Sequence, residues 1–135
     1  MAKAAKSAEL KEAIQSHLEE AQEHVTRLNG DAMHEYDLYV PLFANDGTRT
    51  AATNLRRLRK TLIKHFGGLT EFPQEQRGFW KVGKVTFRDK IVIWRVLSNK
   101  PAVEARTFWS TIKTELGREW RQKEVLVVRR TVTVI

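Results

Sequence analysis

The sequence contains no cysteine, and this absence removes two classes of site. Neither a disulfide nor a thiolate metal centre can form, and a reducing compartment is compatible with the chain. No apolar run approaches the roughly 18 residues needed to cross a bilayer, so we expect no contact with a membrane. The N-terminus carries lysines but lacks the apolar segment of a secretory signal. These absences predict a cytoplasmic protein.

Charge is unevenly distributed along the 135 residues, whose formal net charge is +8. Residues 1–32 hold four basic and six acidic side chains, a net charge of −2, whereas residues 33–135 hold twenty and ten, a net charge of +10. A basic body of this kind permits binding of nucleic acid or another polyanion. It also permits docking of the acidic segment on the basic surface, within one chain or between chains.

Residues 7–29 are predicted to form one helix, with Ser7 as its N-cap and Gly30 suited to the left-handed position that ends it. A helix with a single narrow apolar seam is not stable alone, so it must pack on the body or on a copy of itself. We expect a homo-oligomer, although folding back on the body is the alternative. The seam repeats at spacings of four and three, and its expected association residues are Ile14, Leu18, Val25 and Leu28.

A second pattern begins after Met33, which precedes a complete series of strands and helices from His34 onward. We therefore interpret residues 1–32 as a helical appendage, natural or engineered, and residues 33–135 as one domain. The order β-α-β-β-α-β predicts an α+β fold, a ferredoxin-like sandwich with an antiparallel sheet and two helices on one face. The expected elements are a strand at 36–43, a helix at 49–66, extended residues from 69 with a loop or irregular arm at 73–78, strands at 79–87 and 89–97, a helix opened by Asn99-Lys100-Pro101, and a strand at 124–134. Separate pieces within 69–87 leave a fifth strand open.

Two resemblances accompany these patterns. Residues 8–28, through LKEAIQSHLEEAQEHVTRL, resemble a helix of ferritin-like bacterial proteins of the YciE/YciF type, in which carboxylates and histidines from four helices hold two metal ions. That resemblance makes His17, Glu20 and His24 candidate metal ligands, but one helix supplies too few, and solvated histidines on an associating helix are the simpler interpretation. Residues 34–135, through YDLYVPL, FGGLT, GFW and RDKIVI, look like small uncharacterised bacterial proteins of ferredoxin-like fold. Neither resemblance implies an activity, and we expect no cofactor.

The stretch RGFWKVGK matches part of the RNA-recognition consensus, but residues that consensus uses for stacking are replaced by Lys81 and Lys84. Packing of an aromatic at a strand start is the simpler explanation. Basic residues spaced by four also form a stripe on the 49–66 helix, as phosphate binding requires. The candidate nucleic-acid contacts are Arg56, Lys60, Lys64, Arg77 and Trp80.

No catalytic signature in the sequence is complete. The body has two histidines, His34 and His65, and neither belongs to a recognisable triad. Asp89, in a strand-rich stretch, is the carboxylate that we considered for a small enzyme with a cleft. The sequence therefore favours a non-enzymatic binding or assembly module that associates through its N-terminal helix, its sheet face or both. A nucleic-acid-binding module and a small enzyme using Asp89 are the alternatives.

Overall fold

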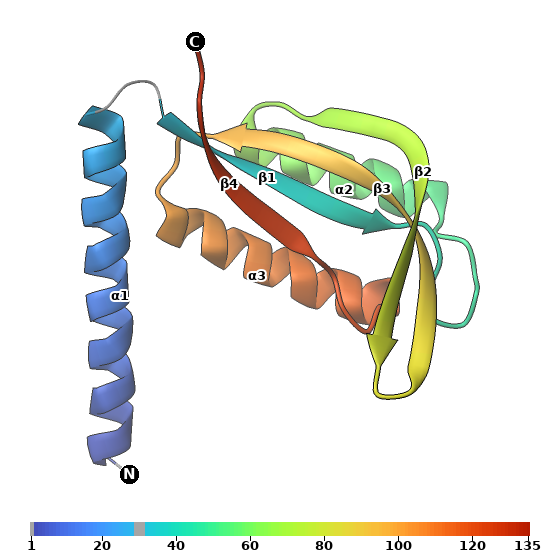
Figure 1. Cartoon of the computed structure of the whole chain (residues 1–135), viewed down its shortest axis with the longest axis horizontal. Helices are drawn as coiled ribbons and strands as arrows, with labels where there is room; N and C mark the ends of the chain where they lie inside the picture. Colours follow the sequence, from blue (N-terminus) through green and yellow to red (C-terminus); the bar gives the residue numbers. More distant parts are fainter. Residues whose placement is uncertain (1, 29–31) are drawn as a thin grey trace.

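The computed structural model describes residues 2–28 and 32–135, with the backbone alone described for residues 2–6, 21–28 and 32. Four strands form one antiparallel sheet in the order β2-β3-β1-β4, and three helices accompany it (Figure 1). This architecture confirms a mixed α+β fold. In chain order the elements are α1 (Ala2–Leu28), β1 (Ala32–Pro41), α2 (Ala52–Phe66), β2 (Thr70–Val82), β3 (Val85–Ser98), α3 (Ala102–Glu119) and β4 (Val127–Thr133).

The hydrophobic core lies on one face of the sheet, between the sheet and helices α2 and α3. Successive residues of a strand point to opposite faces, so alternate side chains of β1 and β3 enter this core. Each fully buried Leu or Val contributes about 1.5–3 kcal/mol through removal of its apolar surface from water. The buried side chains include Tyr36, Leu38 and Val40 from β1, Val92, Trp94 and Val96 from β3, Leu58 and Leu62 from α2, and Trp109, Ile112 and Leu116 from α3.

The helix boundaries of the body follow the signals in the sequence. Gly67 adopts the left-handed conformation with φ of 81°, and its N–H donates to the carbonyl of Ile63 at 2.7 Å, which closes α2. Pro101 occupies the position just before α3, where its missing N–H costs nothing. Trp120 packs into the core at the end of α3. These ends place the Gly67-Gly68 segment directly before β2.

The β2–β3 hairpin differs from the expected strand boundaries. Residues 79–87 do not form one strand, because the chain turns at Gly83. For residues 73–78 the loop is wrong and the alternative is confirmed: they form an irregular arm within one long strand, β2, with the irregularity between Phe72 and Gln76. Gly83 has a φ of 60°, as at the first central residue of a type II′ turn, and Val82 pairs with Val85. Similar strand-forming residues on both sides of the turn hid it in the sequence. The piece from residue 70 onward is thus one long strand, and no fifth strand forms within residues 69–87.

Over residues 7–20, where its side chains are described, helix α1 contacts the body through a polar flank and not through its apolar seam. Glu19 is only 7% exposed and pairs with Arg106 of α3. The seam side chains Ile14 and Leu18 are 50% and 60% exposed, and Leu10 is 61% exposed. In Figure 1 the helix stands beside one end of the body. The alternative in which the seam folds back on the body is therefore wrong for Ile14 and Leu18, while the side chains of Val25 and Leu28 lie outside the described residues.

Within the described residues, none of the helices has both the length and the apolar character that a membrane span requires.

Because the core lies on one face of the sheet, we expect substitutions of two leucines on opposite faces to differ strongly in their effect on the free energy of unfolding. Leu38 is fully buried on the helix side, whereas Leu97 is 43% exposed. We expect Leu38→Ala to lower the free energy of unfolding by about 2–5 kcal/mol, because it leaves a cavity. Leu97→Ala should lower it by under about 1 kcal/mol, since little packing is lost. Urea denaturation of both variants measures the two values, and equal losses would contradict a core confined to one face.

Candidate functional site

The face of the sheet opposite α2 and α3, called here the open face, carries charged side chains at its centre. β1 supplies Glu35 and Asp37, which alternate with the core residues Tyr36 and Leu38. Strand register places Asp37 opposite Arg95 of β3 on one side and beside β4 on the other, where Glu35 faces Arg130. Three different strands thus bring two carboxylates and two guanidinium groups together.

These four residues form a connected carboxylate–guanidinium quartet. Arg95 donates from Nε to Asp37 Oδ1 at 2.8 Å and from its second terminal nitrogen to Asp37 Oδ2 at 3.0 Å. Arg130 donates to Asp37 Oδ2 at 3.0 Å and to Glu35 Oε2 at 3.4 Å. The Asp37 side chain is 3% exposed, compared with 34% for Arg95 and 46% for Arg130. Asp37 is therefore the buried centre of the quartet, and the two arginines reach from it toward solvent.

The hydrogen bonds within the quartet shift the pKa of Asp37 and that of Arg95. Hydrogen bonding from Arg95, and then from Arg130, lowers the pKa of Asp37 from its ordinary 3.8, and these effects outweigh burial, which acts in the opposite direction. The same hydrogen bond raises the pKa of Arg95 above its ordinary range. Asp37 is thus a carboxylate that stays ionised and has both oxygens occupied. This makes it a poor proton acceptor and a good anchor for the two guanidinium groups.

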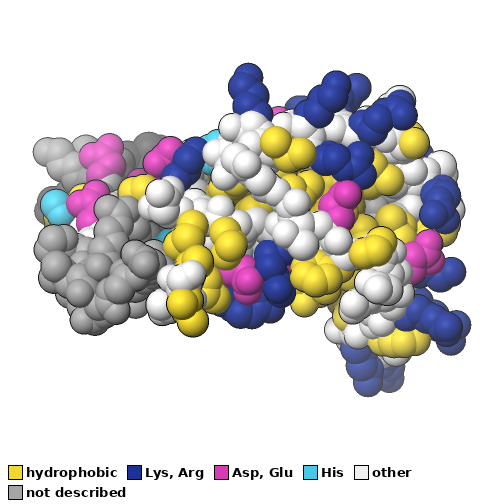
Figure 2. All heavy atoms as spheres, turned by 90° about the horizontal axis from the view of Figure 1, so that it is seen from above, with side chains coloured by type: hydrophobic (Ala, Val, Ile, Leu, Met, Phe, Trp, Pro, Cys, Tyr) yellow, Lys and Arg dark blue, Asp and Glu magenta, His cyan; other side chains and the backbone are white. Residues whose placement is uncertain are grey.

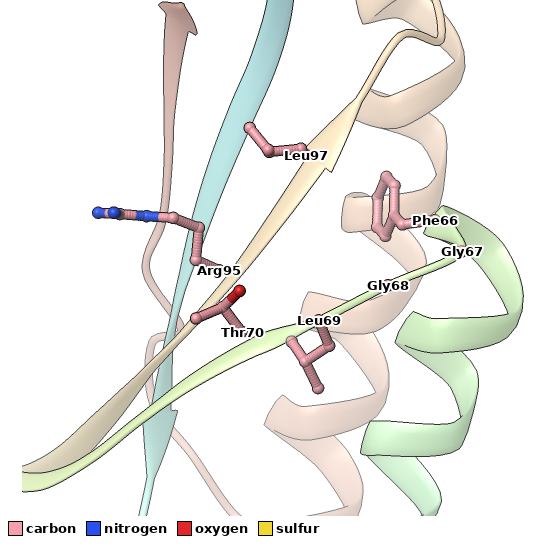
Figure 3. Close-up of a pocket in the computed structure, with 7 residues that line it drawn as sticks. All are labelled: Phe66, Gly67, Gly68, Leu69, Thr70, Arg95 and Leu97. Atoms are coloured by element: carbon pink, nitrogen blue, oxygen red, sulfur yellow. The ribbon is translucent and has the colours of Figure 1, made fainter. Parts of the chain in front are cut away.

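A cavity of about 280 Å³ lies at the end of the sheet beside the quartet. It forms because β3 continues to Ser98 while its neighbour β2 begins only at Thr70, which is opposite Arg95. Gly67 and Gly68 leave space there, since nothing lies within 4 Å of where their Cβ atoms would be. Figure 3 shows Arg95 extending across β1, away from the segment of Gly67 and Gly68. The lining residues are Phe66, Gly67, Gly68, Leu69, Thr70, Arg95 and Leu97.

Arg95 joins the cavity to the quartet, because it belongs to both. Its guanidinium lies over the ring of Phe72, with 4.9 Å from Cζ to the ring centroid. A planar cation held by a carboxylate on one side and by an aromatic ring has a restricted orientation. A small molecule in the cavity would meet apolar side chains, the backbone at two glycines and the base of Arg95, whose guanidinium extends from the cavity toward the quartet.

The predicted nucleic-acid residues are placed on two elements. Arg56, Lys60 and Lys64 are exposed on α2, and Arg77 and Trp80 are on β2. The indole of Trp80 is already engaged, since it stacks on Phe87 and donates to Asp89. On the face seen in Figure 2, Lys and Arg side chains are spread over the body rather than gathered in one groove. Binding of nucleic acid by these residues stays a prediction.

Asp89 does not line the cavity described above. It is an exposed residue of the β2–β3 hairpin, and its carboxylate accepts the Trp80 hydrogen bond. This section of the hairpin presents both of its faces to solvent, and an enzyme site near Asp89 stays a prediction.

The metal candidates on α1 are not brought together with further ligands in the described part of the chain. His17 and Glu20 are exposed, and the side chain of His24 lies outside the described residues. No group of three His, Asp or Glu side chains able to hold a metal occurs among the described residues. The proposed trio itself is thus left untested.

The quartet and the cavity were missed by reasoning from sequence. A signal was present, since each of three apolar strands contains a charge: Asp37 in YDLYV, Arg95 in IVIWRVL and Arg130 in VVRRTV. Trp94 and Arg95 lie on opposite faces of the sheet, and so do Arg129 and Arg130, as the alternation of side chains along a strand requires. Only the register between strands shows that the charges meet.

Comparison with known proteins gives a structural likeness. No protein-family model and no curated protein matches the sequence. Among solved structures, a phage SAM lyase in complex with S-methyl-5'-thioadenosine shares the fold, with a TM-score of 0.55 at 13% sequence identity. The likeness covers 78% of this chain and 92% of that chain.

This likeness corrects the function inferred from sequence. A non-enzymatic binding or assembly module was expected, whereas the protein that shares the fold is an enzyme. The expectation failed because it required a complete catalytic motif within short stretches of sequence. A site assembled from single residues of several strands has no such motif.

The quartet makes a prediction about stability and pH. Asp37→Asn should lower the free energy of unfolding at pH 7 by about 1–3 kcal/mol, because it removes a buried, charge-assisted hydrogen-bond acceptor. Since the pKa of Asp37 is lowered in the folded state, its contribution is present above the ordinary value of 3.8 and is lost as the pH falls through the folded value. The difference between wild type and variant should therefore shrink at acid pH.

Urea denaturation at several pH values measures this difference. Asp89→Asn is the matched control, because it makes the same change at an exposed carboxylate, and its effect should stay under about 0.5 kcal/mol. Equal effects of the two substitutions at pH 7 would contradict the structural role of Asp37.

Proposed function

We propose that this chain is an enzyme of the lyase class that acts on a sulfonium nucleoside of the S-adenosylmethionine type at the open face. The observation that carries the proposal is the buried Asp37, which holds two arginines beside a cavity in a fold shared with a SAM lyase. A shifted pKa and a neighbouring cavity are both features of functional sites. A cytoplasmic location is part of the same proposal.

We also infer a ferredoxin-like topology for residues 33–135. The strand order β2-β3-β1-β4 supports it, because each helix of the body connects two strands that are separated by a third. In such an arrangement the helices occupy one face and the other face is available for a ligand. The position of the quartet on the open face follows from this layout.

The chemistry of the site suits a zwitterionic substrate with an apolar ring. The amino-acid part of S-adenosylmethionine carries a carboxylate and an ammonium group. Arg95 and Arg130 are partly exposed and have N–H groups beyond those bonded to Asp37, so they can bind a carboxylate. Glu35, at 15% side-chain exposure, can accept from the ammonium group. Phe66, Leu69 and Leu97 provide apolar surface for the nucleoside.

Electrostatics at the site are consistent with breaking a carbon–sulfur bond of a sulfonium. As the carbon–sulfur bond breaks, its electron pair goes to sulfur, and the carboxylate of the same substrate forms the new bond to the carbon that sulfur leaves, which gives a lactone and a neutral thioether. The positive charge on sulfur disappears in this step, so a bare protein carboxylate beside it would stabilise the substrate more than the transition state. In the quartet both carboxylates are paired with guanidinium groups. The site therefore orients the substrate without holding its sulfonium strongly. We assign Asp37 as a positioning residue for Arg95 and Arg130.

Turnover and product binding test this proposal. Incubation with S-adenosylmethionine should release S-methyl-5'-thioadenosine, detected by chromatography, and titration calorimetry should show binding of that thioether to the protein. Arg95→Lys keeps the charge but loses the planar fork, so we expect kcat/KM to fall by about 10- to 100-fold, a loss of roughly 1.4–2.7 kcal/mol.

Arg88→Lys is the matched control, because Arg88 is an exposed residue of the hairpin and does not belong to the site. It should leave kcat/KM within about twofold of wild type. Thermal melting of both variants shows whether a loss of turnover reflects unfolding. Absence of both turnover and thioether binding in the wild-type protein would overturn the proposal, as would equal losses in Arg95→Lys and Arg88→Lys.

A further inference from the structure

Over the residues of helix α1 whose side chains are described, the body leaves an apolar seam exposed. Leu10, Ile14 and Leu18 are each exposed by half or more, although they lie on one side of a helix that runs from Ala2 to Leu28. Apolar side chains in such a row on an isolated helix do not stabilise it, and a helix of this composition needs a packing partner. The question is which partner the seam fits.

The spacing of the seam residues favours a second helix as the partner. Ile14, Leu18, Ala21, Val25 and Leu28 are separated by four, three, four and three residues. This is the two-position seam of a heptad repeat, with a mean period of 3.5 residues, whereas a helix packed on a globular body carries a wider apolar face. In heptad terms Leu18 and Val25 take position a, and the other three take position d. Lys11 takes the preceding a position, so the seam begins at Ile14.

The residues that flank the seam favour pairing with an identical helix. In a coiled coil, positions e and g approach the partner helix, and like charges there oppose pairing. These positions hold Gln15 and Gln22 on one side and His17 and His24 on the other, so no carboxylate lies beside the seam. The glutamates take positions b, c and f, which face away from a partner: Glu9, Glu12, Glu19, Glu20 and Glu23. An acidic helix can therefore pair with an identical helix without repulsion between carboxylates at the interface.

The contact between α1 and the body leaves the seam residues Ile14 and Leu18 accessible to a second helix. Glu19, at position b, is buried and pairs with Arg106 of α3, and Gln15 donates to Glu19 at 3.1 Å. The side of the helix that meets its own body is thus a polar flank. The acidic character of α1 is used in this contact with the basic body. Because Glu19 lies on one side and Leu18 is exposed, the body and a second helix can contact α1 at the same time.

We propose that α1 forms a parallel coiled coil with α1 of a second copy of this chain, through Ile14, Leu18, Ala21, Val25 and Leu28. The proposal stands apart from the proposed lyase activity, since it rests on the helix and not on the open face. The seam is short, so the association is concentration-dependent. Its consequence is an assembly in which each copy keeps its own quartet and cavity.

Molecular mass in solution tests the seam. Sedimentation of the full chain over a range of concentrations should show a species of at least twice the 15.7 kDa chain mass. Leu18→Glu should shift this species to the monomer, because it buries a carboxylate in the seam. Ala13→Glu is the matched control: it adds the same side chain at an exposed position outside the seam and should leave the mass unchanged. A monomeric wild type, or an unchanged mass in Leu18→Glu, overturns the proposal.

Crosslinking tests the same seam without relying on a charged substitution. Because the chain has no cysteine, a single introduced thiol can only pair with its counterpart in another copy. Ala21 is the central d position of the seam, so in the parallel pairing that we propose it lies opposite its counterpart in the second helix. Ala21→Cys should form a disulfide-linked dimer under mild oxidation, and Ala13→Cys should not. Equal crosslinking of the two variants, or none in Ala21→Cys, overturns the proposal.

Discussion

The hydrogen bonds of Asp37 with Arg95 and Arg130 are the interaction on which the open face depends. A carboxylate with a side-chain exposure of 3% in the middle of a sheet is costly unless its oxygens are satisfied. Here three N–H groups from two neighbouring strands satisfy them. The pairs also connect β1 with β3 on one side and with β4 on the other. One buried carboxylate thus fixes the position of two guanidinium groups, which are themselves partly exposed to solvent on the open face.

Much of the fold could be predicted from sequence because local signals agreed with it. Gly67-Gly68 and Pro101 mark helix ends, and the alternation in YDLYV and IVIWRV separates buried from open-face residues. The hairpin failed because Val82 and Val85 look like interior strand residues, and a single glycine between them carries the turn. Boundaries depend on one φ angle there, whereas element type depends on many residues.

The candidate site was hidden for a different reason. Asp37 and Arg95 are 58 residues apart in sequence, and Asp37 and Arg130 are 93 apart. No periodicity within one strand reveals which residues of other strands lie opposite, because that depends on register. A charge inside a strongly apolar strand is the available signal, and here it occurs in three strands. Asp89 drew attention instead because it stands in a strand-rich stretch, but it belongs to the exposed section of the hairpin.

Buried and exposed charges have different roles in this chain. The body is basic, yet its most buried charged residue is an acid, because a paired carboxylate can orient two arginines while their tips stay in water. Helix α1 is acidic, yet it keeps its glutamates off the seam and uses Glu19 against Arg106. Net charge therefore describes neither the site nor the helix contact. What matters is which charge is buried, since a buried charge requires a fixed partner and an exposed charge does not. Asp37 and Glu19 are the two buried carboxylates in the described part of the chain. Asp37 holds two arginines at the proposed site, and Glu19 holds α1 against α3 through Arg106.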